Sequence, residues 1–430
     1  MGAIFLLVAK EINKSSSSIR MSTYTVTLPG GASVNIPAHQ AAARPKYVPK
    51  VSYLPTRSGD ASQVWKTSGV FLAFLLPKNV GILRDVRLRF HVSNTAASSA
   101  TQEVPPTCQW VQQIEVNIGT QTVETLYPND LLTEVVGFMN TDETNAKNNE
   151  LGIYTPSAAW GAEAPSGAST YYLPFNNALT CSRLYVAGVD DDITYRVYFP
   201  ANMFPSTFAM TSCVLELHED VPVDTVETQK LRAAHKSGMV YNTVVRQRQQ
   251  TVITKADAAS NMNVDLTGIV GKSAGLVIYA NVAVVPGSGT STSPEDGSTA
   301  IPTNQLLGWR FPITTLEIND QMGNKRTEQL QGAAQQSFVW WDNVGTEFGN
   351  NTNYHTYLIP FASHFKNAVV EAANYGFLSF DGTDRLVLTA PFFKTSGAAP
   401  TSESWVITIT NYLYQQLVFN NNKLVTISKR

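Results

Sequence analysis

The sequence contains two serine patterns that are typical of catalysis or phosphate binding, and each lacks part of what that chemistry needs. Gly271-Lys-Ser-Ala-Gly275 matches the Gly-x-Ser-x-Gly nucleophile elbow of hydrolases, in which the serine stands on a sharp turn between a strand and a helix. Residues 276–285 predict a strand in place of that helix. The same residues resemble the end of a phosphate-binding loop, but Leu266 stands where that loop requires glycine. We therefore predict no catalytic serine and no nucleotide site.

Residue types that bind metal ions are present, but they are not spaced as ligands. The six histidines show no zinc-motif spacing. Asp190-Asp-Asp192 lacks the glycine and the alternating acids of a calcium loop, so these acids predict a turn that opens a strand. Trp340-Trp341 has the chemistry of a sugar-stacking platform, although dense aromatic residues more often line a core or an interface. We predict no metal ion and no cofactor.

The overall composition favours a structural subunit over a nucleic-acid or membrane-surface binder. Charged residues make up 15% of the chain, against a usual fraction of about 25%. Such a surface repels copies of itself only weakly. The net charge of −2 creates no global field that would attract nucleic acid, so we predict no specific nucleic-acid recognition.

The cysteines and the N-terminus bear on the cellular compartment. Cys108, Cys181 and Cys213 are odd in number and far apart, which favours a reducing environment over a disulfide framework. The apolar run 2–9 is too short to span a bilayer and has no basic region before it. We therefore expect no signal peptide, and we expect residues 1–20 to contribute little to the fold.

Residues 1–59 are predicted to form an extended N-terminal arm. Prolines recur between residues 29 and 55 at a density that disfavours helices and central strands. A basic cluster in the same stretch makes the arm a candidate assembly surface, and its members are Arg44, Lys46, Lys50 and Arg57. A disordered tail is the alternative interpretation.

The rest of the chain reads as many short strands between turn signals. In Val86–Val92, apolar residues alternate with Arg87, Arg89 and His91, which is typical of a strand with one solvated face. Strands at this spacing predict a sandwich or jelly roll. Helices are predicted at 129–139 and 325–338, with another within the linker. The predicted domains are a first jelly roll at 60–220, a linker at 221–236 and a second jelly roll at 237–430.

The two halves repeat the same signatures in the same order. Trp110–Gly119 and Phe311–Gly323 share an alternating Ile/Leu-Glu-Val/Ile-Asn core that ends in glycine. Each is followed by a helix-like stretch and then by Tyr171-Tyr-Leu-Pro-Phe175 or Tyr357-Leu-Ile-Pro-Phe361. We therefore predict an all-β chain of two tandem eight-stranded jelly rolls with a few short helices in connecting loops. Glu115 should correspond to Glu317, and Phe175 to Phe361.

The hairpin Ile114-Glu-Val-Asn-Ile-Gly-Thr-Gln-Thr-Val-Glu-Thr-Leu-Tyr127 resembles one that recurs in viral major capsid proteins of the double jelly-roll type. Those of nucleocytoplasmic large DNA viruses, polinton-like viruses and virophages share its Ile-Glu-x-x-Ile-Gly-x-Gln pattern and the tyrosine before a helix. The resemblance is most specific over this stretch and weaker elsewhere, while the doubled organisation extends over residues 60–430.

The resemblance implies a structural role without enzymatic activity. Three copies would form a homotrimer whose six jelly rolls give a pseudo-hexagonal capsomer of an icosahedral virus shell. The implied partners are the chain itself, neighbouring capsomers, vertex and minor capsid proteins and, where one is present, an underlying membrane. The implied location is the virion capsid, assembled inside the host cell.

Two other classes of function remain open from the sequence. A secreted or surface carbohydrate-binding or adhesive β-sandwich would also be all-β with polar loops, and it would carry a signal sequence. A glycan-cleaving enzyme on a two-jelly-roll scaffold would need paired carboxylates, and sequence alone does not show which acids meet in space.

Overall fold

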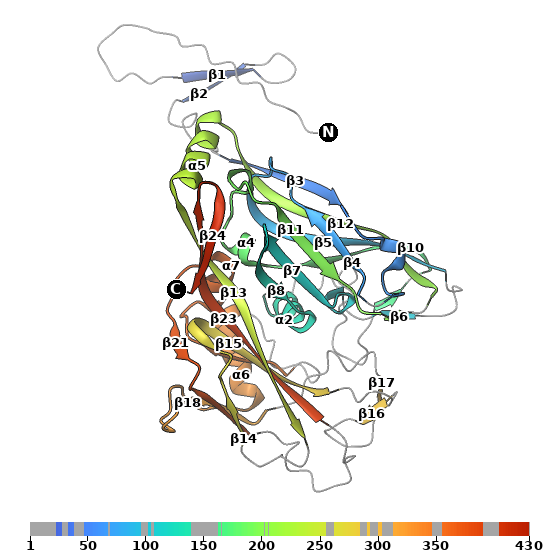
Figure 1. The fold of residues 1–430 in the computed structure, drawn as a ribbon, viewed down its shortest axis with the longest axis vertical. Coiled ribbons are helices and arrows are strands. Elements are labelled where there is room, and N and C mark those ends of the chain that lie inside the picture. Colours follow the sequence, from blue (N-terminus) through green and yellow to red (C-terminus); the bar gives the residue numbers. More distant parts are fainter. Residues whose placement is uncertain are drawn as a thin grey trace.

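The fold is known from a computed structural model (Figure 1). It describes residues 47–95, 107–138, 166–254, 262–283, 313–345, 355–389 and 404–429, except residues 68, 202 and 205, together with the short strands 23–27, 33–37, 102–104, 162–164, 290–292 and 300–302.

The first jelly roll consists of two four-stranded antiparallel sheets, with the orders β10-β5-β12-β3 and β4-β11-β7-β8. Their bounds are β3 (Tyr47–Pro55), β4 (Phe71–Leu75), β5 (Ile82–Asn94), β7 (Gln113–Ile118), β8 (Gln121–Leu126), β10 (Gly167–Pro174), β11 (Ile193–Tyr198) and β12 (Phe208–Pro222).

The second jelly roll has the sheets β13-β23-β15-β20 and β14-β22-β18-β19. Two further strands, β21 (Leu378–Asp381) and β24 (Lys423–Lys429), pair with β15 and β23 at the margins of the first of these sheets. The remaining bounds are β13 (Met239–Thr254), β14 (Met262–Asp265), β15 (Val270–Ala283), β18 (Thr315–Asn319), β19 (Leu330–Gln331), β20 (Tyr357–Pro360), β22 (Arg385–Thr389) and β23 (Ser404–Asn420).

The two jelly rolls have the same topology. When the eight strands of each are counted in chain order, one sheet runs 6-3-8-1 and the other 2-7-4-5 in both. Glu115 and Glu317 both lie in the fourth strand. Phe175 and Phe361 both follow the sixth strand, where their N–H groups donate to Val86 and Ala274 of the third strand. The predicted duplication and fold class are confirmed.

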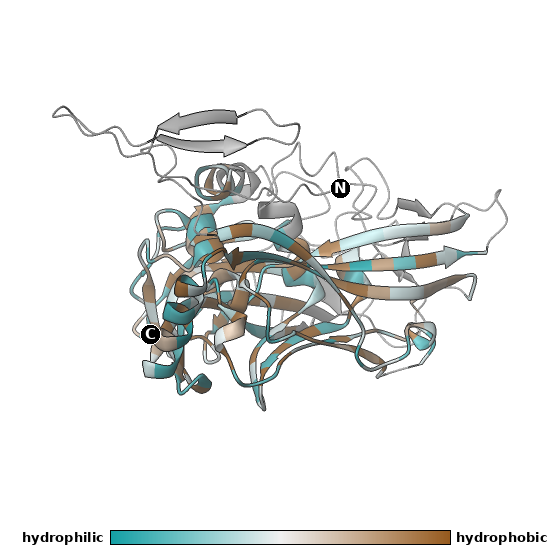
Figure 2. Cartoon of the chain, turned by 90° about the horizontal axis from the view of Figure 1, so that it is seen from above, coloured by the Kyte–Doolittle hydropathy of each residue, from teal (hydrophilic) through white to brown (hydrophobic). Residues whose placement is uncertain are grey.

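Alternating side chains build the core of each roll, and Figure 2 shows hydrophobic and hydrophilic bands alternating along the strands. From Val86 to the end of β5 every second residue is buried, including Leu88 and Phe90, while Arg87 and Arg89 between them are half-buried. This is the one-face burial expected of an antiparallel sheet with one packed side.

Helices occur in the connections between strands. The predicted helix at 129–139 is α2 (Pro128–Phe138), and the linker forms α5 (Thr225–Ser237). The prediction at 325–338 is partly wrong, because Lys325 forms an isolated bridge with Asn319 and residues 330–331 form β19 before α6 (Gly332–Val344) begins. The alternating segment that starts at Trp110 becomes a strand only from Gln113, because η2 (Thr107–Trp110) precedes it. Shorter helices are η1 (Ala61–Gln63), α4 (Ala178–Cys181), η3 (Val186–Gly188) and α7 (Phe365–Glu371).

The predicted arm boundary at residue 59 is wrong. Residues 47–55 form β3, which pairs along its whole length with β12 at the edge of the first sheet. Pro49 and Pro55 are accommodated because an edge strand has a neighbour on one side only. Before β3, the strands β1 (Thr23–Thr27) and β2 (Ser33–Pro37) pair with each other.

The other short hairpins are β6 (Gln102–Val104) with β9 (Ala162–Ala164), and β16 (Thr290–Thr292) with β17 (Ala300–Pro302). Among the residues that the structure describes, no helix has the length and apolar character to cross a membrane.

Candidate functional site

The junction between the two jelly rolls is the candidate functional site. The sheet containing β13, β15, β20 and β23 has two apolar faces. Leu276 and Ile278 point into the core of the second roll, whereas Val277 between them joins the core of the first roll, as do Leu358 and Tyr412. Because one apolar core crosses from the first roll to this sheet, the two rolls form a single packed body.

A buried ion cluster lies in this junction. Arg246 of β13 is enclosed, and its Nη1 donates to Glu124 Oε1 of β8 at 2.7 Å. Its Nε donates to Glu134 of α2. The three side chains are at most 5% exposed. One guanidinium from the second roll is therefore held by two carboxylates from the first.

The cluster extends through bonds that also cross the junction. Glu124 accepts the backbone N–H of Arg246 at 3.0 Å, and the Thr243 hydroxyl of β13 donates to the carbonyl oxygen of Ala178 on α4 at 2.7 Å. On α2, Asp130 accepts the hydroxyl of Thr410 at 2.6 Å, and Tyr412 donates to Glu134 at 3.3 Å. Strands β13 and β23 are thus tied to β8, α2 and α4 by directional bonds, which specify one relative placement more narrowly than apolar contact does.

The cluster holds an excess of carboxylates. Burial raises the pKa of Glu134 to about 7, an effect that Arg246 partly offsets and that the nearby Glu124 and Asp130 reinforce. Burial alone would lower the pKa of Arg246, but its two carboxylate partners outweigh burial and raise that pKa well above its ordinary value. Glu134 Oε2 has no hydrogen-bond partner among the described residues. Arg246 therefore stays charged, while Glu134 is poised to hold a proton near neutral pH.

A second contact between the rolls forms around α5. His235 is fully buried, and its Nε2 lies 2.6 Å from the hydroxyl of Tyr241. Its ring lies against Gly188, where a Cβ would come within 2.8 Å. Burial lowers the pKa of His235 to about 4, so the ring is neutral at physiological pH. A side chain larger than hydrogen at residue 188 would push α5 away from the first roll.

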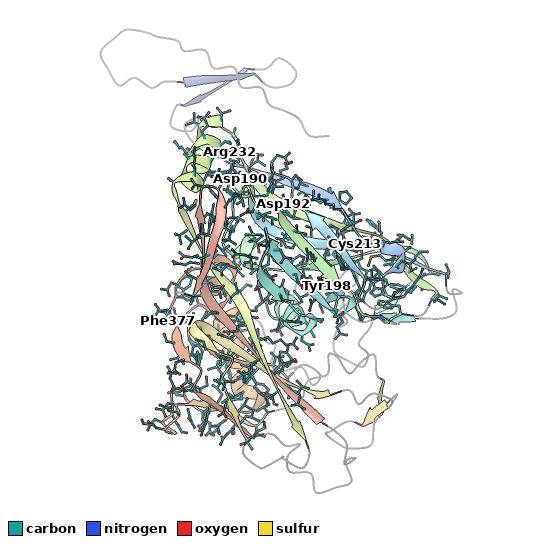
Figure 3. The ribbon with its side chains drawn as sticks, in the orientation of Figure 1. Asp190, Asp192, Tyr198, Cys213, Arg232 and Phe377 are labelled. Atoms are coloured by element: carbon teal, nitrogen blue, oxygen red, sulfur yellow. The ribbon has the colours of Figure 1, made fainter. Side chains whose placement is uncertain are left out.

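The three adjacent acids lie at this second contact (Figure 3). The N–H of Asp190 donates to Asn422 in the β23–β24 turn at 2.7 Å, and Asp191 accepts the N–H of Leu424 at 3.0 Å. Asp192 directly precedes β11, as predicted for a strand-opening turn. These acids join the two rolls, and the described residues hold no group of three or more potential ligands suited to a metal ion.

The predicted basic cluster is only partly within the described residues. Lys50 lies on β3 and forms an ion pair with the buried Glu219 at 3.0 Å. Arg57 is exposed, and its backbone N–H donates to Ala73 at 2.8 Å. Arg44 and Lys46 lie outside the described residues. Lys50 is therefore part of a sheet edge and not of a free arm.

Sequence reasoning missed the ion cluster. Glu124 and Glu134 are 122 and 112 positions from Arg246, so no local pattern pairs them. One signal was available, because Asp130 and Glu134 recur four residues apart on a helix whose neighbours are apolar. By contrast, the serine of the elbow pattern has a structural role. Ser273 is fully buried, and its hydroxyl is hydrogen-bonded to the backbone of Gly275.

No protein-family model matches the chain, and neither does any curated protein sequence. Solved structures do match. PBCV-1 VP54, fitted into a reconstruction of the virophage Sputnik, superposes with a TM-score of 0.63 at 14% identity over 89% of this chain and 98% of that chain. The PBCV-1 virus capsid gives 0.61 at 15% identity over 89% and 98%. The Faustovirus major capsid protein gives 0.55 at 8% identity over 88% and 91%. This chain therefore has the double jelly-roll fold of these viral capsid proteins.

Proposed function

We propose that the chain is a major capsid protein whose homotrimers form the pseudo-hexameric capsomers of an icosahedral virus shell. The observation that carries this proposal is the pair of equivalent jelly rolls joined through a buried junction. Each chain contributes two similar jelly rolls at a fixed angle to each other. Three chains therefore contribute the six jelly rolls of a pseudo-hexagonal outline. The fold shared with capsid proteins supports the same role.

The junction gives the proposed subunit its mechanism. A tile must keep its outline while it forms contacts with several neighbours, so the angle between the two rolls has to be stable. The bonds of Arg246 with Glu124 and Glu134 hold β13 to β8 and α2. The low charge of the chain allows copies to approach one another closely. The role is therefore mechanical, with no reaction step.

The further partners follow from this role. We propose neighbouring capsomers, vertex and minor capsid proteins and, where one is present, an underlying membrane. The chain would be assembled inside the host cell and located in the virion capsid. The N-terminal segment 1–46, which carries Arg44 and Lys46, is proposed as an assembly arm.

The alternatives are less well supported. A glycan-cleaving site needs two carboxylates that a sugar can reach. Glu124 and Glu134 are close together, but both are enclosed and bonded to Arg246. A carbohydrate-binding role for Trp341, which is 57% exposed, would require polar groups beside the ring that orient a sugar.

Light scattering of the purified protein at micromolar concentration tests the proposal. We expect a mass about three times the chain mass of 46.9 kDa, and particles with a hexagonal outline in negative stain. A persistent monomer would contradict the capsomer proposal. Deleting residues 1–46 should leave the trimer and its thermal midpoint nearly unchanged and impair shell formation, whereas an unfolded deletion variant would place the segment in the core.

A further inference from the structure

The internal duplication identifies a second surface that matches the buried face of the junction. The register of the strands gives the equivalent positions. Pro174 pairs with Arg87 as Pro360 pairs with Gly275, and from there the third, eighth and first strands can be followed in both rolls. Tyr53 of β3 then corresponds to Arg246 of β13, Glu216 to Tyr412, Arg89 to Val277 and Tyr172 to Leu358.

These equivalent positions differ in burial. In the second roll, α2, β8 and α4 of the first roll cover this face, and Val277, Leu358 and Tyr412 are at most 1% exposed. In the first roll none of the described helices packs on this face, and Tyr53 is 55% exposed and Val51 43% exposed. Two apolar side chains are thus left open on a face whose counterpart is fully packed.

The uncovered face carries groups that favour contact with aromatic side chains. The Arg89 guanidinium lies between two rings, 6.0 Å from the centroid of Tyr53 and 5.6 Å from that of Tyr172. Its Nε has no hydrogen-bond partner among the described residues. A flat cation flanked by tyrosines is a preferred contact for further aromatic side chains.

The second roll carries the element that would cover such a face. In the first roll, the helix after the fifth strand is α2, and its counterpart after β19 is α6. Trp340 and Val344 are buried on the inner side of α6, while Phe338 and Trp341 are 70% and 57% exposed. The last two are three residues apart, so they share one outward face.

We propose that the outward face of α6, with Phe338 and Trp341, docks on the β3-β12-β5-β10 face of a second copy of this chain. This contact between two chains is arranged like the junction between the two rolls of one chain, and it is head-to-tail. The proposal rests on the proposed function, because it specifies the interface of the proposed trimer. Head-to-tail contacts close into a ring when the rotation fits, so first and second rolls would alternate around the capsomer.

The chemistry of the two faces fixes that alternation. The α2 helix presents Glu134, which pairs with the guanidinium of Arg246, and Asp130, which accepts the hydroxyl of Thr410. The uncovered face offers Tyr53 at the corresponding position, so docking α2 there would leave buried carboxylates without a cation. The aromatic face of α6 suits Val51 and Tyr53 instead. Each helix therefore has one compatible sheet face.

Cross-linking between two variants, each with one added exposed cysteine, tests the contact directly. Tyr53→Cys protein is mixed with Trp341→Cys protein, subunits are exchanged, and a short bismaleimide is added; the native cysteines are buried. We expect covalent dimers in this mixture. The matched control replaces Trp341→Cys with Val425→Cys, which is 55% exposed on β24, and should give none. Equal cross-linking in both mixtures, or none in either, would overturn the interface.

Charge substitutions provide a second test of the same contact. Trp341→Glu and, on the opposing face, Tyr53→Glu should each raise the trimer dissociation constant by roughly 100-fold, as removal of a central aromatic does, while Val425→Glu leaves it unchanged. Circular dichroism checks that each variant is folded, and either of the first two tests the contact if the other does not fold. A wild-type monomer would overturn both the proposed function and this interface. A wild-type trimer that persists in both glutamate variants would overturn the interface alone.

Discussion

Glu134 gives the junction a pH dependence of predictable sign. Burial raises the pKa of its carboxyl from 4.5 to about 7, so the folded chain retains a proton that the unfolded chain releases between those values. An acid whose pKa is higher in the folded state loses stability as the pH rises through that window. Stability from this group should therefore be complete below about pH 4.5 and reach its minimum above about pH 7.

The Glu134→Gln variant removes this titration and keeps the side-chain shape. Its amide oxygen can still accept from Arg246 Nε and from Tyr412. Raising the pKa of Glu134 from 4.5 to about 7 corresponds to a free-energy difference of roughly 3–4 kcal/mol between the two protonation states. The advantage of the variant in free energy of unfolding should be smallest at the acid end, near pH 5, and should grow by up to about 3 kcal/mol by pH 8.

Thermal midpoints between pH 5 and pH 8.5 measure this effect, taken as the difference between variant and wild type. His235 titrates in both proteins, so its contribution cancels in that difference. The control is Glu328→Gln, because Glu328 is exposed, and it should run parallel to the wild type. Parallel profiles for Glu134→Gln would refute the raised pKa. A variant less stable than the wild type at pH 8 would show that ionised Glu134 strengthens the junction.

The other predictions concern the same two contacts and the duplicated core. Arg246→Met leaves buried carboxylates without their cation and should lower the free energy of unfolding by roughly 3–5 kcal/mol in chemical denaturation. Gly188→Ala places a methyl group 2.8 Å from the His235 ring and should cost about 1–3 kcal/mol, visible as a lower thermal midpoint and faster hydrogen exchange in α5. Ile118→Ala should cost roughly 2–5 kcal/mol because Ile118 is 1% exposed, whereas Glu115→Ala on the half-buried side of β7 should change little. Similar losses at residues 115 and 118 would contradict the assigned inner face.

The strands that sequence predicted best are those whose burial depends on their own roll. Ile114, Val116 and Ile118 alternate in the sequence and are all buried in β7. The edge strand β3 was missed because its prolines and its exposed face remove that alternation. Its burial pattern has intermediate positions but no buried ones, so the residues of this strand carry little hydrophobic signal.

The junction could not be predicted from the sequence because its side chains become buried and paired only when the two rolls pack against each other. Arg246 lies in a strand whose alternation alone would place it on a solvated face. Its position on that face is correct, yet the first roll covers it. The lysine and arginine cluster misled in the opposite direction, since Lys50 serves an ion pair with Glu219 within a sheet. The positions of charged residues in the sequence therefore predicted which strand faces point away from the core of a roll. They did not predict which elements cover those faces.

The contrast between the two equivalent faces suits a subunit that must be rigid within and reversible between copies. Within the chain, the covered face is centred on a buried ion cluster whose rupture exposes charges that have lost their partners, which makes partial opening costly. Between chains, the proposed contact is centred on Phe338, Trp341 and Tyr53, whose separation leaves no unpaired buried charge. A misplaced copy can then dissociate without disturbing the angle between its own two rolls. The duplicated fold would in this way give each chain one permanent contact, the junction between its two rolls, and one reversible contact, the proposed interface with another copy.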